Sequence, residues 1–239
     1  MDKDKIALVT GANKGIGFET SRQLGKLGYK VLLGIRDKER GQKAVDALKE
    51  EGIDAQLIVL DVTSQNTIDN AVKFIEKEYG HLDILINNAG VFLEKGVLPS
   101  QLKLTTLRET FEVNFFGAFA MITAMLPLLK KSTGGRIVNV SSGQGSLTRS
   151  SGPDSTRIQL AYNSSKAALN ALTIQFAKEL KNTPIKINAA APGYTITDMN
   201  EGKGQRTVQQ ASQIIVKLAM LDETGTSGGY FEDAGEIPW

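Results

Sequence analysis

Thr10-Gly11-Ala12-Asn13-Lys14-Gly15-Ile16-Gly17 is the stretch that decides the fold of this chain. It follows the apolar run Ile6–Val9 and opens the amphipathic segment Gly15–Leu27, which together predict a buried strand that turns directly into a helix. Glycines permit such a tight turn and let a ligand approach the backbone, while the free N–H groups of a helix start attract phosphate. The spacing, G-x-x-x-G-x-G, can also belong to an ordinary turn, but its place after the first strand favours a dinucleotide-binding loop.

The remainder of the chain repeats this alternation between short apolar runs and longer amphipathic segments. The expected strands are Ile6–Val9, Val31–Ile35, Gln56–Leu60, Leu82–Ile86, Arg136–Val140, Ile185–Ala190 and Gly229–Phe231. The expected helices are Gly15–Leu27, Lys38–Glu51, Gln65–Tyr79, Leu104–Lys131, Gln159–Lys181 and Val208–Leu221. This pattern predicts an α/β fold with a doubly wound, mostly parallel, Rossmann-type sheet of about seven strands and helices on both faces. We expect one domain over residues 1–239, with ligand-site loops at Ser141–Ile158 and Gly193–Arg206, because both follow strand ends.

Composition excludes several kinds of chemistry. The 239 residues carry a formal net charge of +2 with both signs intermixed, so neither nucleic acid nor a membrane surface is an expected partner. The absence of cysteine excludes disulfides, thiolate nucleophiles and Cys-ligated metals, and no metal site is expected. The one histidine, His81, precedes the fourth strand and so lies away from the ligand-binding strand ends, and Trp239 is expected to cover the core. The charged start is unlike a signal peptide and no apolar run reaches the roughly 18 residues of a membrane span, so a cytoplasmic protein is expected.

Three further motifs follow the glycine loop, and each is weak evidence by itself. Asn87-Asn88-Ala89-Gly90 ends the fourth strand and could be a plain turn. Gly135-Arg136-Ile137-Val138-Asn139-Val140-Ser141-Ser142 ends the fifth strand in two serines, which are common turn residues. Tyr162-Asn163-Ser164-Ser165-Lys166 places a tyrosine and a lysine on one helix face. A nearby ammonium lowers the pKa of a tyrosine from its usual value of about 10, which suits a proton donor.

In this order, the loop and the three motifs resemble the short-chain dehydrogenase/reductase family over nearly the whole chain. The resemblance implies that Tyr162 is the general acid, that Lys166 lowers its pKa and binds the nicotinamide ribose, and that Ser142 orients the substrate carbonyl. Asn114, within Val113-Asn114-Phe115-Phe116-Gly117, matches the family asparagine that helps to hold a water chain to the lysine. The expected catalytic residues are therefore Asn114, Ser142, Tyr162 and Lys166.

The resemblance also implies a cofactor site. Pro192-Gly193-Tyr194-Thr195-Ile196-Thr197 looks like the family segment whose threonine, here Thr197, contacts the nicotinamide carboxamide, and Asp61-Val62 matches the adenine-contacting pair. The expected cofactor-binding residues are Gly11, Asn13, Lys14, Gly15, Ile16, Gly17, Arg36, Asp61, Val62, Asn88, Ala89, Gly90, Tyr162, Lys166, Pro192, Gly193, Thr195 and Thr197.

The residues after the second strand favour NADPH (NADP+) over NADH as the cofactor. NAD sites usually place an acidic residue there for the ribose hydroxyls, whereas this strand continues Gly34-Ile35-Arg36. Arg36 offers a fork for the 2′-phosphate and Lys14 a second cation, although both could be solvated surface cations. Asp37 is better explained as the cap of the following helix.

Several segments look like the carbonyl reductase branch of the family, which implies NADPH-dependent hydride transfer to a small-molecule ketone or aldehyde. These segments are Asn13-Lys14, Ala189–Asp198 and Gly225–Asp233. Two alternatives stay open: a same-fold enzyme with another reaction, such as alcohol oxidation or enone reduction, and an NADPH-binding sensor or regulator without turnover. Extra residues around Thr148–Arg157 lie near the helix that packs dimers in the family, so a monomer or homodimer is expected rather than the usual tetramer.

Overall fold

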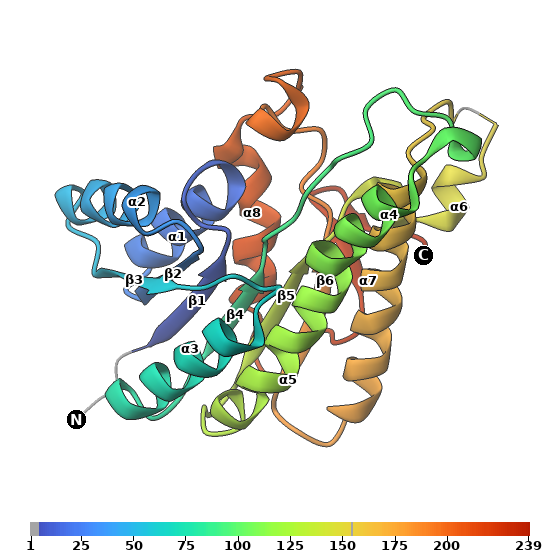
Figure 1. The fold of residues 1–239 in the computed structure, drawn as a ribbon. Coiled ribbons are helices and arrows are strands. Elements are labelled where there is room, and N and C mark those ends of the chain that lie inside the picture. The colour runs from blue at the N-terminus through green and yellow to red at the C-terminus, as the bar shows by residue number, and fades with distance from the viewer. Residues whose placement is uncertain (1–4, 154) are drawn as a thin grey trace.

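Eight strands form one sheet in the computed structural model, which describes residues 5–153 and 155–239 (Figure 1). Their order is β3-β2-β1-β4-β5-β6-β7-β8, and all neighbours are parallel except β7 and β8. The strands are β1 Ile6–Thr10, β2 Lys30–Ile35, β3 Ala55–Val59, β4 Ile84–Asn87, β5 Arg136–Val140, β6 Lys186–Ala190, β7 Tyr230–Glu232 and β8 Gly235–Glu236. The predicted doubly wound, mostly parallel sheet is confirmed, and the two-residue strand β8 is an addition that the sequence pattern does not predict.

Helices cover both faces of this sheet, as predicted (Figure 1). One layer holds α1 Gly15–Lys26, α2 Lys38–Glu50 and α8 Val208–Ala219, and the other holds α3 Gln65–Glu78, α4 Leu104–Phe111, α5 Ala118–Leu129 and α7 Leu160–Glu179. Short helical turns in the connections are η1 Pro99–Gln101, η3 Gly143–Gly145, α6 Leu147–Ser150 and η4 Asp198–Asn200. Strand β1 shows why two layers form: Ile6 and Leu8 pack into the core under α5, whereas Ala7 and Val9 pack into the core under α1.

The strand order reverses between β1 and β4, which positions the site. Val9 pairs with Ile86 and Ile86 pairs with Val138, so the carboxyl ends of β1, β4 and β5 coincide at one edge of the sheet. The glycine loop follows β1, the Asn-Asn-Ala-Gly motif follows β4, and the paired serines follow β5. They therefore meet at the switch point where doubly wound sheets bind ligands.

The long helix predicted over Leu104–Lys131 is interrupted. Between α4 and α5 lies a π-helical turn, η2 Glu112–Gly117, which is a kind of turn frequent at functional sites. Gly117 lets this turn pack closely, because a Cβ there would lie 2.7 Å from Val62 Cγ2. Leu104–Leu129 is long and apolar enough to cross a membrane, with a mean hydropathy of 1.6, but it packs with α3, α7 and the sheet as part of the helix layer.

Candidate active site

The glycine loop after β1 has the form of a phosphate cradle. Gly11 adopts φ 65°, and a Cβ at this position would lie 3.0 Å from Ala89 Cα. A Cβ on Gly17 would lie 2.3 Å from Asn88 Nδ2, so a side chain there would displace the neighbouring motif. Helix α1 begins after Lys14 without a side-chain cap and without an acidic residue in its first turn, so its first N–H groups face no competing side-chain oxygen. These residues fit the pyrophosphate of a dinucleotide.

The Asn-Asn-Ala-Gly motif braces this loop rather than forming a plain turn. Thr10 Oγ1 accepts hydrogen bonds from the backbone N–H groups of Asn88 and Ala89, both at 3.0 Å. In return Asn88 Nδ2 donates to Thr10 O at 2.8 Å and to Gly11 O at 3.2 Å. The motif therefore fixes the shape of the floor below the predicted cofactor.

Ser142, Tyr162 and Lys166 come together at the end of β5. Tyr162 and Lys166 lie one turn apart on α7, with Lys166 Nζ 5.8 Å from the centre of the Tyr162 ring. The Ser142 side chain forms a hydrogen bond with Tyr162, and its Oγ accepts the backbone N–H of Gln144 at 3.2 Å. Ser141 instead turns away, donating to Asn170 Oδ1 at 2.6 Å, as a structural residue does. The structure thus unites three of the four predicted catalytic side chains.

Burial governs the acidity of this group. Lys166 is 4% exposed, and the loss of solvent lowers the pKa of its ammonium from 10.5 to about 8. Burial also raises the pKa of the Tyr162 phenol, and the hydrogen bond from Ser142 offsets only part of that rise. The expected lowering of the Tyr162 pKa by Lys166 is therefore wrong for this structure. The physical reason is that desolvation of the phenolate dominates. The Lys166 Nζ lies 5.8 Å from the centre of the Tyr162 ring and donates to Val140 O at 2.7 Å.

Asn114, the fourth predicted residue, lies in the π turn and acts as a clamp. Its Oδ1 accepts the backbone N–H of Val91 at 2.8 Å, and its Nδ2 donates to Val91 O at 3.0 Å and to Ser165 Oγ at 3.0 Å. The side chain is 1% exposed and its polar atoms are paired, which a buried amide requires. It ties the chain after the Asn-Asn-Ala-Gly motif to α7, next to Tyr162 and Lys166. A Cβ on Gly90 would lie 3.5 Å from Lys166 Nζ, so the motif, the clamp and the lysine are direct neighbours.

Tyr230 was not predicted as a site residue, yet it contacts the loop that carries Ser142, here called the serine loop. The Tyr230 hydroxyl donates to Ser142 O, and burial raises the pKa of this phenol to about 12. Its ring stacks on Trp239 at 5.2 Å, so the terminal tryptophan covers a small core cluster as expected. No sequence motif includes Tyr230. Strand β7 lies next to β6, which lies next to β5, and only this sheet order brings the Tyr230 side chain to the loop after β5.

Arg36 and Lys14, which are predicted to bind the 2′-phosphate, lie in different surroundings. Arg36 lies exposed just after β2, as expected, and Asp37 caps α2 by accepting the N–H of Arg40 at 3.0 Å. Lys14 is an exposed cation that has a partner: its Nζ forms a surface ion pair with Asp198 Oδ2 at 2.6 Å. Sequence spacing could not reveal this pair, because Asp198 lies far along the chain in the loop after β6.

That loop after β6 folds against the phosphate cradle. Thr197 caps the turn η4, and its Cγ2 would lie 3.8 Å from a Cβ on Gly15. Thr195 is 4% exposed and donates to Gly193 O at 3.1 Å, so its hydroxyl serves the loop itself. The predicted nicotinamide-contacting segment therefore lies beside the glycine loop.

Asp61 and Val62, the predicted adenine-contacting pair, are held by their own neighbours. Asp61 Oδ1 accepts the N–H and the hydroxyl of Thr63 at 2.9 and 2.7 Å. Val62 is buried against Gly117 of the π turn. His81 is buried at the opposite end of β4, where its Nε2 lies 3.2 Å from Asp83 Oδ2. His81 therefore lies at the end of β4 away from the motif residues, where the sequence placed it.

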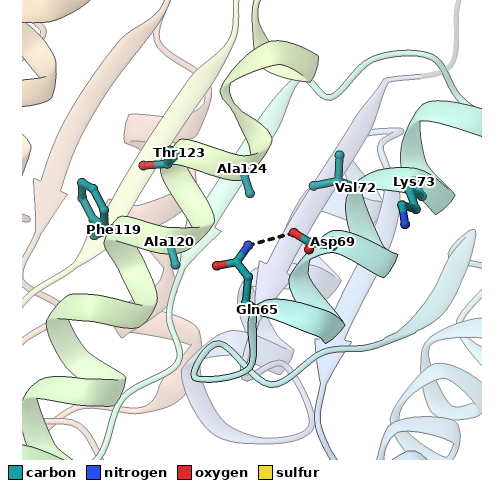
Figure 2. A pocket seen from close by; sticks show the side chains of 8 residues that line it. All are labelled: Gln65, Asp69, Val72, Lys73, Phe119, Ala120, Thr123 and Ala124. Atoms are coloured by element: carbon teal, nitrogen blue, oxygen red, sulfur yellow. Dashed lines mark hydrogen bonds between the residues drawn. The ribbon is translucent and has the colours of Figure 1, made fainter.

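The described part of the chain has hollows on its surface. One hollow, of about 340 Å³, is formed by the segment that follows Ser142 in the sequence. It is lined by Gln144, Thr148, Arg149, Gly152, Ser155, Thr156 and Arg157. Another, of about 390 Å³, lies between α3 and α5 and is lined by Gln65, Asp69, Val72, Lys73, Phe119, Ala120, Thr123 and Ala124 (Figure 2). On one wall Gln65 Nε2 donates to Asp69 Oδ1 at 2.8 Å, and this hollow contains none of the predicted site residues.

A Rossmann-type sheet with a glycine cradle at its switch point is the arrangement that binds nicotinamide dinucleotides. The short chain dehydrogenase family model matches residues 5–207. Carbonyl reductase (NADPH) 3 of Rattus norvegicus is 34% identical, over 98% of this chain and 98% of its own. The (+)-neomenthol dehydrogenase of Arabidopsis thaliana is 33% identical, over 95% of each chain. The NADPH-bound carbonyl reductase from chicken fatty liver is 28% identical with a TM-score of 0.87, covering 99% of this chain and 100% of its own. The chain therefore belongs to the short-chain dehydrogenase/reductase family.

Proposed function

We propose that the protein is an NADPH-dependent carbonyl reductase that converts a small-molecule ketone or aldehyde into an alcohol. The observation that carries the proposal is the group Ser142–Tyr162–Lys166, held together at the switch point beside the glycine cradle. The likeness to a carbonyl reductase of Rattus norvegicus supports the same reaction class.

The proposed chemistry assigns one task to each side chain. NADPH, when bound, supplies the hydride to the carbonyl carbon. Tyr162 donates its phenolic proton to the carbonyl oxygen, so the C=O double bond becomes a CH–OH group. The Ser142 hydroxyl donates a hydrogen bond to the same oxygen and stabilises its developing negative charge. Lys166 contacts the nicotinamide ribose, and Asn114 keeps the lysine and Tyr162 in place through Val91 and Ser165.

The residues around the cradle fit a bound NADPH. The pyrophosphate is assigned to the glycine loop and the start of α1, and the nicotinamide carboxamide to Thr197. Arg36 and Lys14 are assigned to the 2′-phosphate, for which Lys14 exchanges its exposed partner Asp198. No carboxylate of β2 lies where NADH would need one, because the strand ends Gly34-Ile35.

The same site also supports the reverse reaction, alcohol oxidation, which the likeness to a (+)-neomenthol dehydrogenase favours as a second candidate. In that direction Tyr162 accepts the proton of the alcohol. A preference for NADPH favours reduction as the direction at work in the cell. We further propose that the chain acts in the cytoplasm, as one domain, as a monomer or homodimer.

A cofactor-oxidation screen tests the proposal. NADPH consumption is followed by absorbance with a panel of ketones, aldehydes and quinones, and alcohol oxidation with NADP+ is measured in parallel. Turnover of at least one carbonyl with NADPH supports the reductase. Tight NADPH binding with no turnover in either direction contradicts it and points to a sensor or regulator.

A further inference from the structure

Helix α7 carries Tyr162 and Lys166, yet it begins without a cap of its own. Its first residue follows Gln159, whose side chain makes no capping hydrogen bond. The helical hydrogen-bond ladder starts only where Asn163 N–H donates to Gln159 O at 2.9 Å. The N–H groups of the first turn, including that of Tyr162, therefore need partners from outside the helix.

Glu94 supplies the partner for Tyr162. Its Oε1 accepts the backbone N–H of Tyr162 at 2.5 Å, across 68 positions of sequence. A carboxylate at a helix start is favoured by the helix dipole, and a charge-assisted hydrogen bond is stronger than a neutral one. The N–H group that donates this hydrogen bond belongs to the proposed proton donor itself.

The burial of Glu94 shows that this contact is costly to maintain. The residue is 1% exposed, and its Oε2 has no hydrogen-bond partner within the described residues. Burying a carboxylate with one unpartnered oxygen costs desolvation free energy, and a single capping hydrogen bond offsets only part of that cost. General stability is therefore a poor explanation for an acid at this position.

The chain around Glu94 holds Tyr162 from one side as a unit. Asn114 fixes both backbone groups of Val91. The Phe92 ring meets the Tyr162 ring edge-on, with centroids 5.4 Å apart. Two residues later, Glu94 Oε1 accepts the backbone N–H of Tyr162. The segment after the Asn-Asn-Ala-Gly motif thus contacts both the ring and the main chain of this tyrosine.

We propose that Glu94 is a positioning residue, whose carboxylate holds Tyr162 at the distance from Ser142 and Lys166 that proton transfer needs. Its catalytic consequence rests on the proposed carbonyl reductase function, whereas the hydrogen bond to Tyr162 N–H does not. Glu94 acts on the position of Tyr162 and not on the pKa of its phenol, because the hydrogen bond is to the backbone N–H. The role therefore requires a side chain of this size with an acceptor oxygen.

Tyrosine-selective ¹⁵N labelling tests the contact without turnover, since the chain has five tyrosines and the Tyr162 amide is assigned by its loss in Tyr162→Phe. In Glu94→Ala we expect the Tyr162 amide proton to move upfield and to exchange about tenfold faster, because its acceptor is gone. Glu94→Gln keeps an acceptor oxygen and retains most of the wild-type shift. An unchanged Tyr162 amide in Glu94→Ala overturns the proposal.

Steady-state kinetics of the same variants test the consequence. Glu94→Ala lowers kcat by about tenfold to a hundredfold, as misplacement of a catalytic group does, while KM for NADPH stays within about twofold. Glu94→Gln restores kcat to within about threefold of the wild type, because a neutral acceptor forms a weaker version of the same bond. Glu19→Ala removes another buried carboxylate, paired with Arg22 on α1, and is the matched control that loses stability but not kcat.

The two failures are distinguishable. If the wild type turns over no substrate, the proposed function is wrong, while the Tyr162 amide still decides whether Glu94 holds the tyrosine. If the wild type is active and Glu94→Ala keeps its kcat, or Glu94→Gln falls as far as Glu94→Ala, the positioning role is wrong.

Discussion

At the scale of single residues, Lys166 combines burial with charge. Its Nζ has a backbone acceptor, Val140 O, and desolvation lowers the pKa of the ammonium from 10.5 to about 8. Below about pH 8 the lysine is charged in both the folded and the unfolded chain, so the cost of burying the charge is fully present. Burial of this charge is a cost that the fold accepts at the site of the proposed chemistry.

This cost predicts a pH dependence of stability. Between about pH 8 and 10.5 the folded lysine is neutral while the unfolded lysine is still charged, so the unfolded chain binds more protons and stability rises with pH. The shift corresponds to about 3 kcal/mol at most. We expect the unfolding free energy of the wild type, from urea denaturation, to rise by up to that amount relative to Lys166→Met over this window. Parallel pH profiles for the two proteins would refute the burial argument, since titration of the tyrosines cancels in the comparison.

Lys14 and Arg36 predict the cofactor preference at the same scale. Each offers a charge-assisted hydrogen bond to a 2′-phosphate, so removing both by Lys14→Ala and Arg36→Ala is expected to raise KM for NADPH at least about tenfold. KM for NADH, which lacks this phosphate, should change by less than about twofold. Lys43→Ala, which removes an exposed cation from α2, is the control. Unchanged kinetics with NADPH in the double variant would show that both cations are ordinary surface charges.

At the scale of elements, the strand β7 supports the loop that carries Ser142. Tyr230 donates its hydroxyl to Ser142 O, and Arg149 of α6 forms a two-pronged ion pair with Glu232 of β7 at 2.8 and 2.9 Å. Ser146 Oγ also donates to Pro238 O at 2.6 Å. The last part of the chain therefore fixes the serine loop by contacts that the sequence order does not reveal.

Removal of the hydroxyl in Tyr230→Phe tests this support. The loss of one buried hydrogen bond is expected to lower the unfolding free energy by about 1–3 kcal/mol and to leave Ser142 less well held. We expect kcat to fall by about threefold to tenfold with little change in NADPH affinity, because the cradle is untouched. Tyr29→Phe, which removes a hydroxyl just before β2, serves as the comparison. A Tyr230→Phe enzyme with wild-type kcat would show that Ser142 is held without this bond.

The elements themselves were largely predictable, because strand burial and helix amphipathicity are written in local patterns. Most predicted bounds agree with the structure to within one or two residues. The π turn at Glu112–Gly117 was not predictable, because it depends on the contact of Gly117 with Val62 and of Asn114 with Val91. Strand β8 was missed because two residues carry no periodicity.

At the scale of the whole molecule, the sheet order explains why separate motifs form one site. The predicted loops meet because the ends of β1, β4 and β5 coincide, and the Ser–Tyr–Lys group follows from that register. What the sequence could not predict is set by distance in space: the ion pair of Lys14 with Asp198, the burial that raises the pKa of Tyr162, and the contacts of Glu94 and Tyr230. The family motifs predict the residues of the proposed chemistry, whereas the neighbours that hold them emerge only from the fold.

The central claim is that Tyr162 is the proton donor of a carbonyl reduction, and turnover by Tyr162→Phe tests it most directly. The substitution keeps the ring that packs against Phe92 and removes only the hydroxyl. With a carbonyl substrate of the wild type, we predict that kcat falls by about a hundredfold to ten-thousandfold, as for loss of a general acid, while NADPH binding measured by fluorescence is unchanged. A Tyr162→Phe enzyme with full kcat and normal NADPH binding would contradict the account.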